Sequence, residues 1–165
     1  MKKLILSAVA VLMFVNCMAQ AQLAFPFQGG KDVMNKFFKD NLVASPELIQ
    51  KRATGMVIFK FTADENGKIT KMIIYYADDM ILVPPVIAAL KKTNRKWIIP
   101  DHEALNDFIL PVSFRFNSPV VDSVKTHNEA YDYMQHRKPI FSTDQIPLDL
   151  ATLLPAIMVT YDIKE

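Results

Sequence analysis

Two runs of alternating residues, joined by an Asn-Gly turn, constrain this chain more than any other feature. The first run covers residues 56–63, where one set of side chains is Val57, Phe59, Phe61 and Ala63 and the other is Ile58, Lys60 and Thr62. Residues 64–67 read Asp-Glu-Asn-Gly, and Asn-Gly favours a tight hairpin turn because both residues tolerate a positive φ. The second run covers residues 68–76 and sets Ile69, Ile73 and Tyr75 against Thr70, Met72 and Tyr76. A period of two is typical of half-buried strands, so the sequence predicts an antiparallel hairpin.

Two helices and a third strand complete this unit. Apolar residues at helical spacing, centred on Val33 and Phe37 with Met34 and Phe38 beside them, predict a helix over about 30–42. Pro84 and Pro85 favour the start of a second helix, and Val86, Ala89, Leu90 and Trp97 fall roughly on one face. Residues 108–116 alternate again, and Pro111 lacks a donor, which predicts that this third strand lies at or begins at a sheet edge. Residues 25–117 thus predict an α+β fold in which two helices pack on a three-stranded antiparallel sheet.

The first 21 residues are typical of a secretory signal peptide. Lys2 and Lys3 precede a short apolar run, 4–15, and small residues at Ala19 and Ala21 suit cleavage after Ala21. An uncleaved anchor and lipid attachment at Cys17 are the alternatives. Cleavage removes the chain's one cysteine and leaves 17 basic against 17 acidic residues. The exported chain therefore has no thiol chemistry and no charge excess that would favour nucleic acid, and we expect no spanning segment after cleavage.

Residues 118–165 form an extension whose role the sequence leaves open. Asn128 suits the start of a short helix that ends near Arg137, and three prolines interrupt the chain beyond it. Residues 157–163 alternate like a terminal strand. This strand either adds to the first sheet or pairs with another chain.

Few residues carry a pattern that suggests chemistry. His102 lies in an Asp-His-Glu run that we interpret as a turn, and His127 and His136 would reach a metal with Asp132 only if the extension folds around it. The adjacent Asp78 and Asp79 follow a strand, where aspartates usually form turns. We interpret the basic cluster at 91–96 as a surface feature and Trp97 as core. We therefore expect no catalytic, cofactor-binding or metal site, and a protein that is not an enzyme.

A short sheet has two edges with unpaired main-chain groups, which proteins either cover or use. Using an edge means that an extended peptide adds to the sheet as a further strand. We predict the third strand as this docking edge, with residues Leu110, Val112, Ser113, Phe114, Arg115 and Phe116. Closure of the same edge by residues 157–163 is the alternative.

The order of motifs resembles the C-terminal domain of TonB, in the form common in Bacteroidetes. The resemblance covers about 25–117 and rests on Phe25-Pro26, Gly29-Gly30, Ser45-Pro46, Gly55-Met56-Val57 with Phe59 and Phe61, Gly67-Lys68-Ile69, residues 86–90, Trp97 with Pro100, and Pro111-Val112-Ser113-Phe114. It implies a periplasmic protein that contacts the plug peptide of outer-membrane transporters by strand addition along its last strand. A serine replaces the usual tyrosine before Pro46. A signal peptide stands where a transducer has a membrane helix and a spacer, so the resemblance implies binding rather than energy transduction.

These observations predict an exported, non-enzymatic binding module whose partner is a protein, in one version a TonB-dependent transporter. The alternative is a structural or assembly protein of the cell envelope whose edge pairs with a second copy to give a homodimer. A hydrolase or metal enzyme built on the extension is a third hypothesis, and it depends on His127 and His136.

Overall fold

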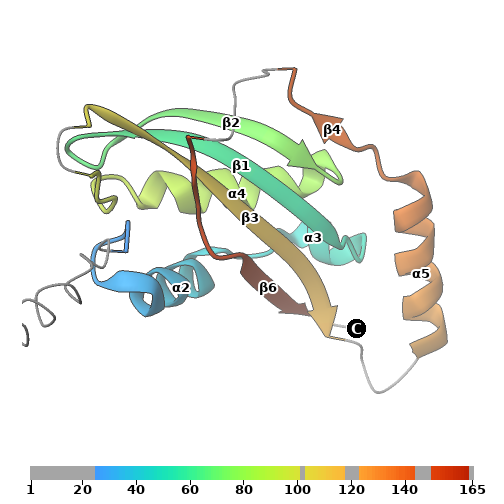
Figure 1. Ribbon diagram of the computed structural model, residues 1–165. Helices are drawn as coiled ribbons and strands as arrows, with labels where there is room; N and C mark the ends of the chain where they lie inside the picture. The colour runs from blue at the N-terminus through green and yellow to red at the C-terminus, as the bar shows by residue number, and fades with distance from the viewer. Residues whose placement is uncertain (1–24, 101–102, 118–122, 144–149, 164–165) are drawn as a thin grey trace, which may run out of the picture.

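The computed structural model describes residues 25–100, 103–117, 123–143 and 150–163 (Figure 1). The predicted signal peptide and His102 lie outside these residues. The described elements, in chain order, are α2 (Gly30–Asn41), α3 (Pro46–Gln50), β1 (Gly55–Asp64), β2 (Ile69–Ala77), the 3-10 turn η1 (Met80–Leu82), α4 (Val83–Lys92), β3 (Leu105–Asn117), α5 (Ser123–His136), β4 (Ile140–Phe141), β5 (Thr152–Leu153) and β6 (Ile157–Asp162).

A mixed sheet of six strands forms the centre of the described molecule. Its strand order is β4-β2-β1-β3-β5, and β6 also pairs with β3. The pairs of β1 with β2 and with β3 are antiparallel, whereas β5 and β6 run parallel to β3. The α+β class is therefore confirmed, but a sheet of only three antiparallel strands is wrong. The extension supplies the three added strands and places them on both sides of the predicted unit.

The predicted hairpin is present with almost the expected bounds. Asp64 holds the turn, because its carboxylate accepts hydrogen bonds from the amides of Asn66 and Lys68. Gly67 has a φ of 69°, and a Cβ there would overlap the carbonyl oxygen of Trp97. Only glycine fits this turn without strain.

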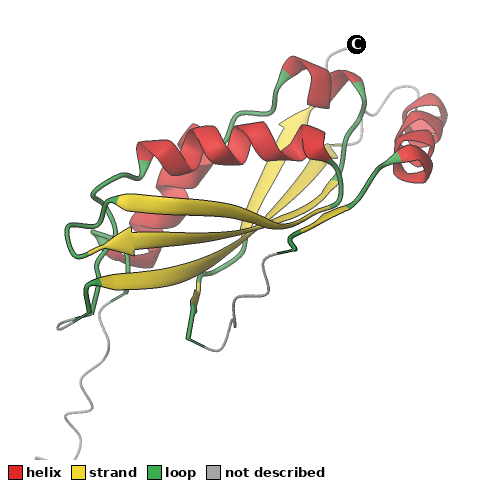
Figure 2. Ribbon diagram, turned by 90° about the horizontal axis from the view of Figure 1, so that it is seen from above, coloured by secondary structure: helices red, strands yellow, loops and turns green. Residues whose placement is uncertain are grey.

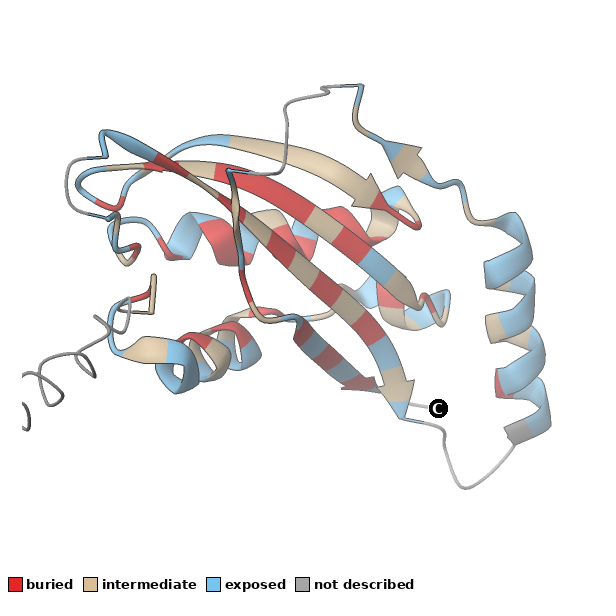
Figure 3. Cartoon of the chain, in the orientation of Figure 1, coloured by how far each residue is buried: buried red, intermediate tan, exposed pale blue. Residues whose placement is uncertain are grey.

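The core lies between one face of the sheet and helices α2 and α4 (Figure 2). β1 and β3 contribute alternating buried side chains, as the sequence predicts, and Figure 3 shows this alternation along both strands. Trp97 is buried, contacts Phe27, Phe61 and Phe108 through ring edges and faces, and donates from Nε1 to the hydroxyl of Thr93 at 2.9 Å. The interpretation of Trp97 as a core residue is confirmed.

The sequence pattern leaves open which faces of α2 and β2 are buried, and the structure decides both. In α2 the buried residues are Met34 and Phe38, while Val33 is 49% exposed. In β2 the register places Met72 beside Phe61, on the core side, whereas Ile73 lies beside Lys60 on the other face. Irregularities at both ends of β2 change its alternation, and the simple period of two cannot foresee them.

The first described element of the extension is α5, which stands beside the sheet rather than across it (Figure 1). This helix begins at Ser123, ahead of the predicted cap at Asn128. The predicted terminal strand is confirmed as β6, and it adds to the first sheet. Among the described residues, no helix combines the length and the apolar character that crossing a bilayer requires.

Candidate functional site

The predicted docking edge on β3 is occupied by the chain itself. β6 pairs with β3 from Val112 to Asn117, and the amide of Leu154 donates to the carbonyl of Ile109 at 2.9 Å. β3 is therefore an inner strand, and the expectation that residues 110–116 form a free edge is wrong. The physical reason is that the extension offers a strand of matching alternation, so the unpaired groups of β3 are satisfied within the molecule.

Pro111 interrupts neither ladder of β3. The pairing of β1 with β3 has no bulge from Gly55 to Asp64. On the β2 side, the carbonyl of Met56 accepts a hydrogen bond from the amide of Asp78. Since main-chain groups alternate in direction along a strand, those of the even-numbered residues of β1 point toward β2. Pro111 lies opposite Ile58, one of these residues, so the position of its missing N–H faces away from β1. On that outer side lies the stretch 154–156, between β5 and β6, which is not a strand. Pro111 thus marks the break between two parallel strands and not the edge of the sheet.

The six predicted edge residues divide between the two faces of β3. Leu110, Val112 and Phe114 are buried under the helices, and Phe116 on the same face is partly buried against the core, whereas Ser113 and Arg115 lie on the other face. Met56 and Met158 lie on either side of Ser113 in the register, and both are exposed. The structure brings the six together in one strand, but it commits the first three to the core.

Core contacts hold β6 in place. Ile157, Val159 and Tyr161 are buried, while the side chains between them are exposed. The hydroxyl of Tyr161 donates to the carbonyl oxygen of Ala53 at 2.7 Å. Burial raises the pKa of Tyr161 to about 12, although the positive charge of Arg52 acts in the opposite direction. At neutral pH this tyrosine is therefore a protonated donor that joins the last strand to the loop before β1.

The outer edge of β2 is one open edge in the described part of the chain; β6 likewise pairs on one side alone, with β3. Because the even-numbered residues of β1 face β2, the register turns Lys71 and Ile73 toward β1 and turns the main-chain groups of Met72 and Ile74 outward. No described strand pairs with these outward groups. No residue from Ile69 to Tyr76 is fully buried, as expected for an edge strand.

Both ends of this edge are closed by other elements. The amide of Ile69 donates to the side-chain oxygen of Asn94 at 3.1 Å. At the other end, β4 pairs with Tyr76 and Ala77, and the rings of Tyr76 and Phe141 lie 5.3 Å apart. The open stretch is thus residues 70–74, bounded by the Asn94 contact at one end and by β4 at the other.

Asp78 connects the β4 end of this edge to the C-terminal end of α5. Its carboxylate accepts hydrogen bonds from the amide of Met56 and the hydroxyl of Tyr76, and it forms an ion pair with Arg137 at 3.4 Å. The hydrogen bond to Asp78 is the main cause of the raised pKa of Tyr76. Asp79 accepts from the amide of Ile81 and caps η1. The structure thus gives both aspartates the turn and capping roles that the sequence favours.

The sheet face opposite the helices carries a buried ion pair. The Nζ of Lys60 lies 2.9 Å from Asp107, and the Lys60 side chain is only 4% exposed. Partial burial alone would raise the pKa of Asp107, but hydrogen bonds from Thr62 and Lys60 and the charges of Lys60 and Lys71 hold it below its usual value. The alternation predicts a polar strand face for Lys60 and contains no signal that this side chain is buried.

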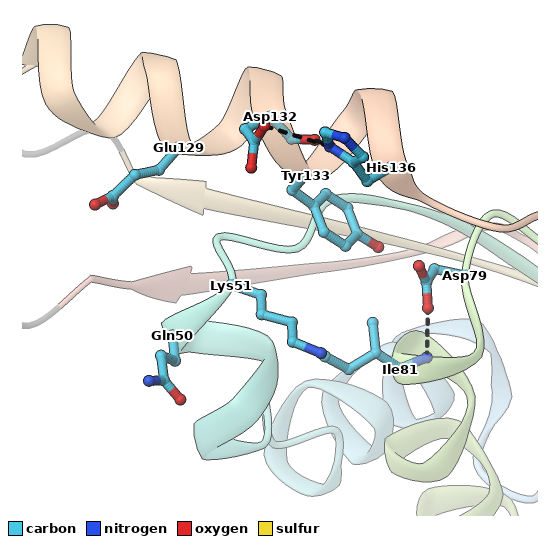
Figure 4. A pocket seen from close by; sticks show the side chains of 8 residues that line it. All are labelled: Gln50, Lys51, Asp79, Ile81, Glu129, Asp132, Tyr133 and His136. Carbon is cyan, nitrogen blue, oxygen red and sulfur yellow. Dashed lines mark hydrogen bonds and ion pairs between the residues drawn. The ribbon is translucent and has the colours of Figure 1, made fainter.

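A polar pocket of about 440 Å³ lies between α5, the end of α3 and η1 (Figure 4). Glu129 is paired with Arg52, Asp132 with His136, and Lys51 with Glu47, while Asp79 accepts from the amide of Ile81. The ring of Tyr133 points from α5 toward Asp79, and its buried hydroxyl makes no hydrogen bond in the described structure. Burial is the main cause of the raised pKa of Tyr133. We find here no pairing of a nucleophile with a base.

The two histidines that the structure describes, His127 and His136, do not form a metal site with other described residues. His127 and His136 both belong to α5, where His136 contacts Asp132 of the preceding turn. Among the described residues, no group of three or more His, Cys, Asp or Glu side chains has an arrangement that would hold a metal ion.

No protein-family model, no curated protein and no solved structure matches this chain. The resemblance to the TonB C-terminal domain therefore stays a prediction. Sequence reasoning misses the edge of β2, because Pro111 draws attention to the third strand as the edge. Thr70 and Lys71 are adjacent polar residues, so the strand at residues 69–76 has polar side chains on both of its faces. This is the signal that could indicate an edge strand there.

Proposed function

We propose that this chain is an exported, non-enzymatic binding module that takes up an extended peptide as an additional strand beside β2. The observation that carries this proposal is the open stretch at residues 70–74, bounded by Asn94 and β4. An edge of this kind offers main-chain donors and acceptors to any extended peptide, and the neighbouring side chains set the register.

Docking along β3 has a larger cost. A peptide there must first displace β6, which buries Ile157, Val159 and Tyr161. Burial of a side chain such as isoleucine or valine contributes about 1.5–3 kcal/mol. A partner would have to replace these contacts before it gained any affinity, whereas no described strand has to leave residues 70–74 of β2.

The partner class follows from the motif order in residues 25–117. The resemblance to the TonB C-terminal domain supports a periplasmic location and an outer-membrane transporter peptide as partner.

The test uses a peptide from the periplasmic N-terminus of a TonB-dependent transporter, titrated into the labelled protein and followed by amide NMR. We expect shifts and slower hydrogen exchange at Met72 and Ile74. Met72→Pro removes an outward N–H and should abolish these changes, whereas Met72→Ala loses the same side chain but keeps the donor and should still bind. Both variants are first checked for the wild-type pattern of amide signals in β1 and β3.

The other outcomes each decide the proposal. Shifts along residues 110–116 with loss of the β6 signals would replace the β2 edge by the β3 edge. Shifts at neither strand would overturn strand addition by this peptide. If light scattering shows a concentration-dependent dimer that Met72→Pro abolishes, the edge serves a second copy of the chain and the assembly alternative replaces our proposal.

A further inference from the structure

Rows of neighbouring side chains extend across the sheet and end at the open edge of β2. Two such rows lie on the helix face, and their members in β2, β1 and β3 are Met72, Phe61 and Phe108 in one and Ile74, Phe59 and Leu110 in the other. The members from β1 and β3 are buried, whereas Met72 and Ile74 pack against the core but stay partly exposed. No described strand continues these rows beyond β2 at residues 70–74. An added strand would complete both rows with the side chains that it places on this face.

A third row lies between these two, on the face away from the helices. It consists of Ile73 of β2, Lys60 of β1 and Ile109 of β3, and Leu153 of β5 extends it. The side chain of Lys60 is buried and its amine pairs with Asp107, while Ile73 and Ile109 on either side are partly exposed. At the open edge this row therefore also ends in an apolar side chain.

The chain's own β4 shows how β2 receives a neighbouring strand. β4 lies beside Tyr76 and Ala77, in the position that an added strand would take at residues 70–74 (Figure 1). Its Phe141 is 70% exposed, and its ring centre lies 5.3 Å from that of Tyr76. The strand that the structure places beside β2 thus contacts β2 through an apolar side chain of its own.

The apolar part of the edge has a clear beginning. Thr70 and Lys71 are exposed, and the register with β1 shifts between Ile69 and Lys71. From Lys71 to Ile74 the register has no shift, so the three rows stay in line.

We infer that the partner of this edge is an extended peptide with three consecutive apolar residues, which lie opposite residues 72–74 and continue the three rows. Side chains of a strand alternate between its faces, so a strand that is apolar on one face alone cannot fill all three positions. This inference rests on the proposed strand addition and adds the side-chain pattern of the partner to it.

The test compares two capped peptides of about seven residues, within the usual range of strand lengths. Both contain three isoleucines, two serines and two threonines, but the isoleucines are consecutive in one peptide and alternate with serine in the other. In every register, the alternating peptide leaves a serine or threonine opposite at least one of residues 72–74. By amide NMR titration, we expect the consecutive peptide to bind about tenfold more tightly, because one more isoleucine side chain is removed from water.

Two variants with the same substitution locate the effect. Ile73→Thr makes the edge of the third row polar and keeps a β-branched residue, so the two peptides should bind about equally. The control is Ile109→Thr, which makes the same change on the other side of Lys60, in an inner strand, and should keep the preference. Ile73→Val, a smaller change, should reduce the preference in part. All three variants are first checked for the wild-type pattern of amide signals in β1 and β3.

The results separate this inference from the proposed function. Equal binding of the two peptides to the wild type, with shifts at Met72 and Ile74, would overturn the apolar partner and leave strand addition intact. A preference that survives in Ile73→Thr, or that disappears in Ile109→Thr, would also overturn it. If neither peptide shifts the amide signals of β2, strand addition itself is refuted.

Discussion

The hydrogen bond between Tyr161 and Ala53 provides a direct test of how β6 is held. Tyr161→Phe removes the hydroxyl and leaves the carbonyl of the buried Ala53 without this donor. An unpaired buried polar group costs about 1–3 kcal/mol. With a urea m value of about 1–3 kcal/mol/M, the unfolding midpoint should fall by about 1 M.

The control is Tyr131→Phe, at an exposed tyrosine of α5, which should change the free energy of unfolding by less than about 0.5 kcal/mol. Both variants are compared with the wild type by urea unfolding at neutral pH. Equal midpoints for Tyr161→Phe and Tyr131→Phe would refute the reasoning, because the bond to Ala53 would then contribute nothing.

Alkaline pH gives a second measurement on the same tyrosine. Its pKa is raised from 10.0 in the unfolded chain to about 12, so folding favours the protonated form. The associated stability is present below pH 10 and is lost as the pH rises toward 12. At about pH 11 the advantage of the wild type over Tyr161→Phe should therefore shrink by about 1 kcal/mol. An advantage that grows with pH contradicts this.

Two further substitutions test the turn and the buried ion pair. Gly30→Ala should lower the free energy of unfolding by about 1–2 kcal/mol because of the positive φ, since nothing lies within 4 Å of the new Cβ. Gly67→Ala should lower it further, because its Cβ meets the backbone oxygen of Trp97. Equal melting temperatures of the two variants would contradict the close contact. Asp107→Asn should cost about 3 kcal/mol in urea unfolding, because the buried Lys60 loses its counter-charge, and adding Lys60→Met should restore much of this. The pKa of Asp107 lies below 3.8, so its contribution is present above that value and lost as the pH falls through the folded pKa; full stability of the wild type at about pH 2 would contradict it.

Local patterns in the sequence predicted the centre of the fold well. The alternation of Val57, Phe59 and Phe61 and the Asn-Gly turn require only neighbouring residues, so their information is contained in a short window. The faces of α2 and β2 are not fixed in this way, because Val33 and Met34 are both apolar and the bulges of β2 arise from pairing with β1.

The candidate site was harder to predict than the fold. Pro111 correctly indicated a position where a ladder bond is missing, but that position faces a gap between two strands of the extension rather than solvent. The same residue pattern fits both arrangements. The basic cluster is visible in the sequence as composition, whereas its closeness to β2 depends on the bonds of Asn94 and Arg95.

The amino-acid sequence by itself determined the hairpin, the apolar faces of β1 and β3, and the strand character of residues 157–162, because each depends on the period of side chains along a single segment. The tertiary structure decided that β6 closes β3, that no described strand pairs with the outer edge of β2 between Asn94 and β4, and that Lys60 is buried. These outcomes depend on which distant segments compete for the same main-chain donors and acceptors. Side-chain periodicity shows which face of a strand is buried, but the neighbour of that strand is chosen by the whole chain.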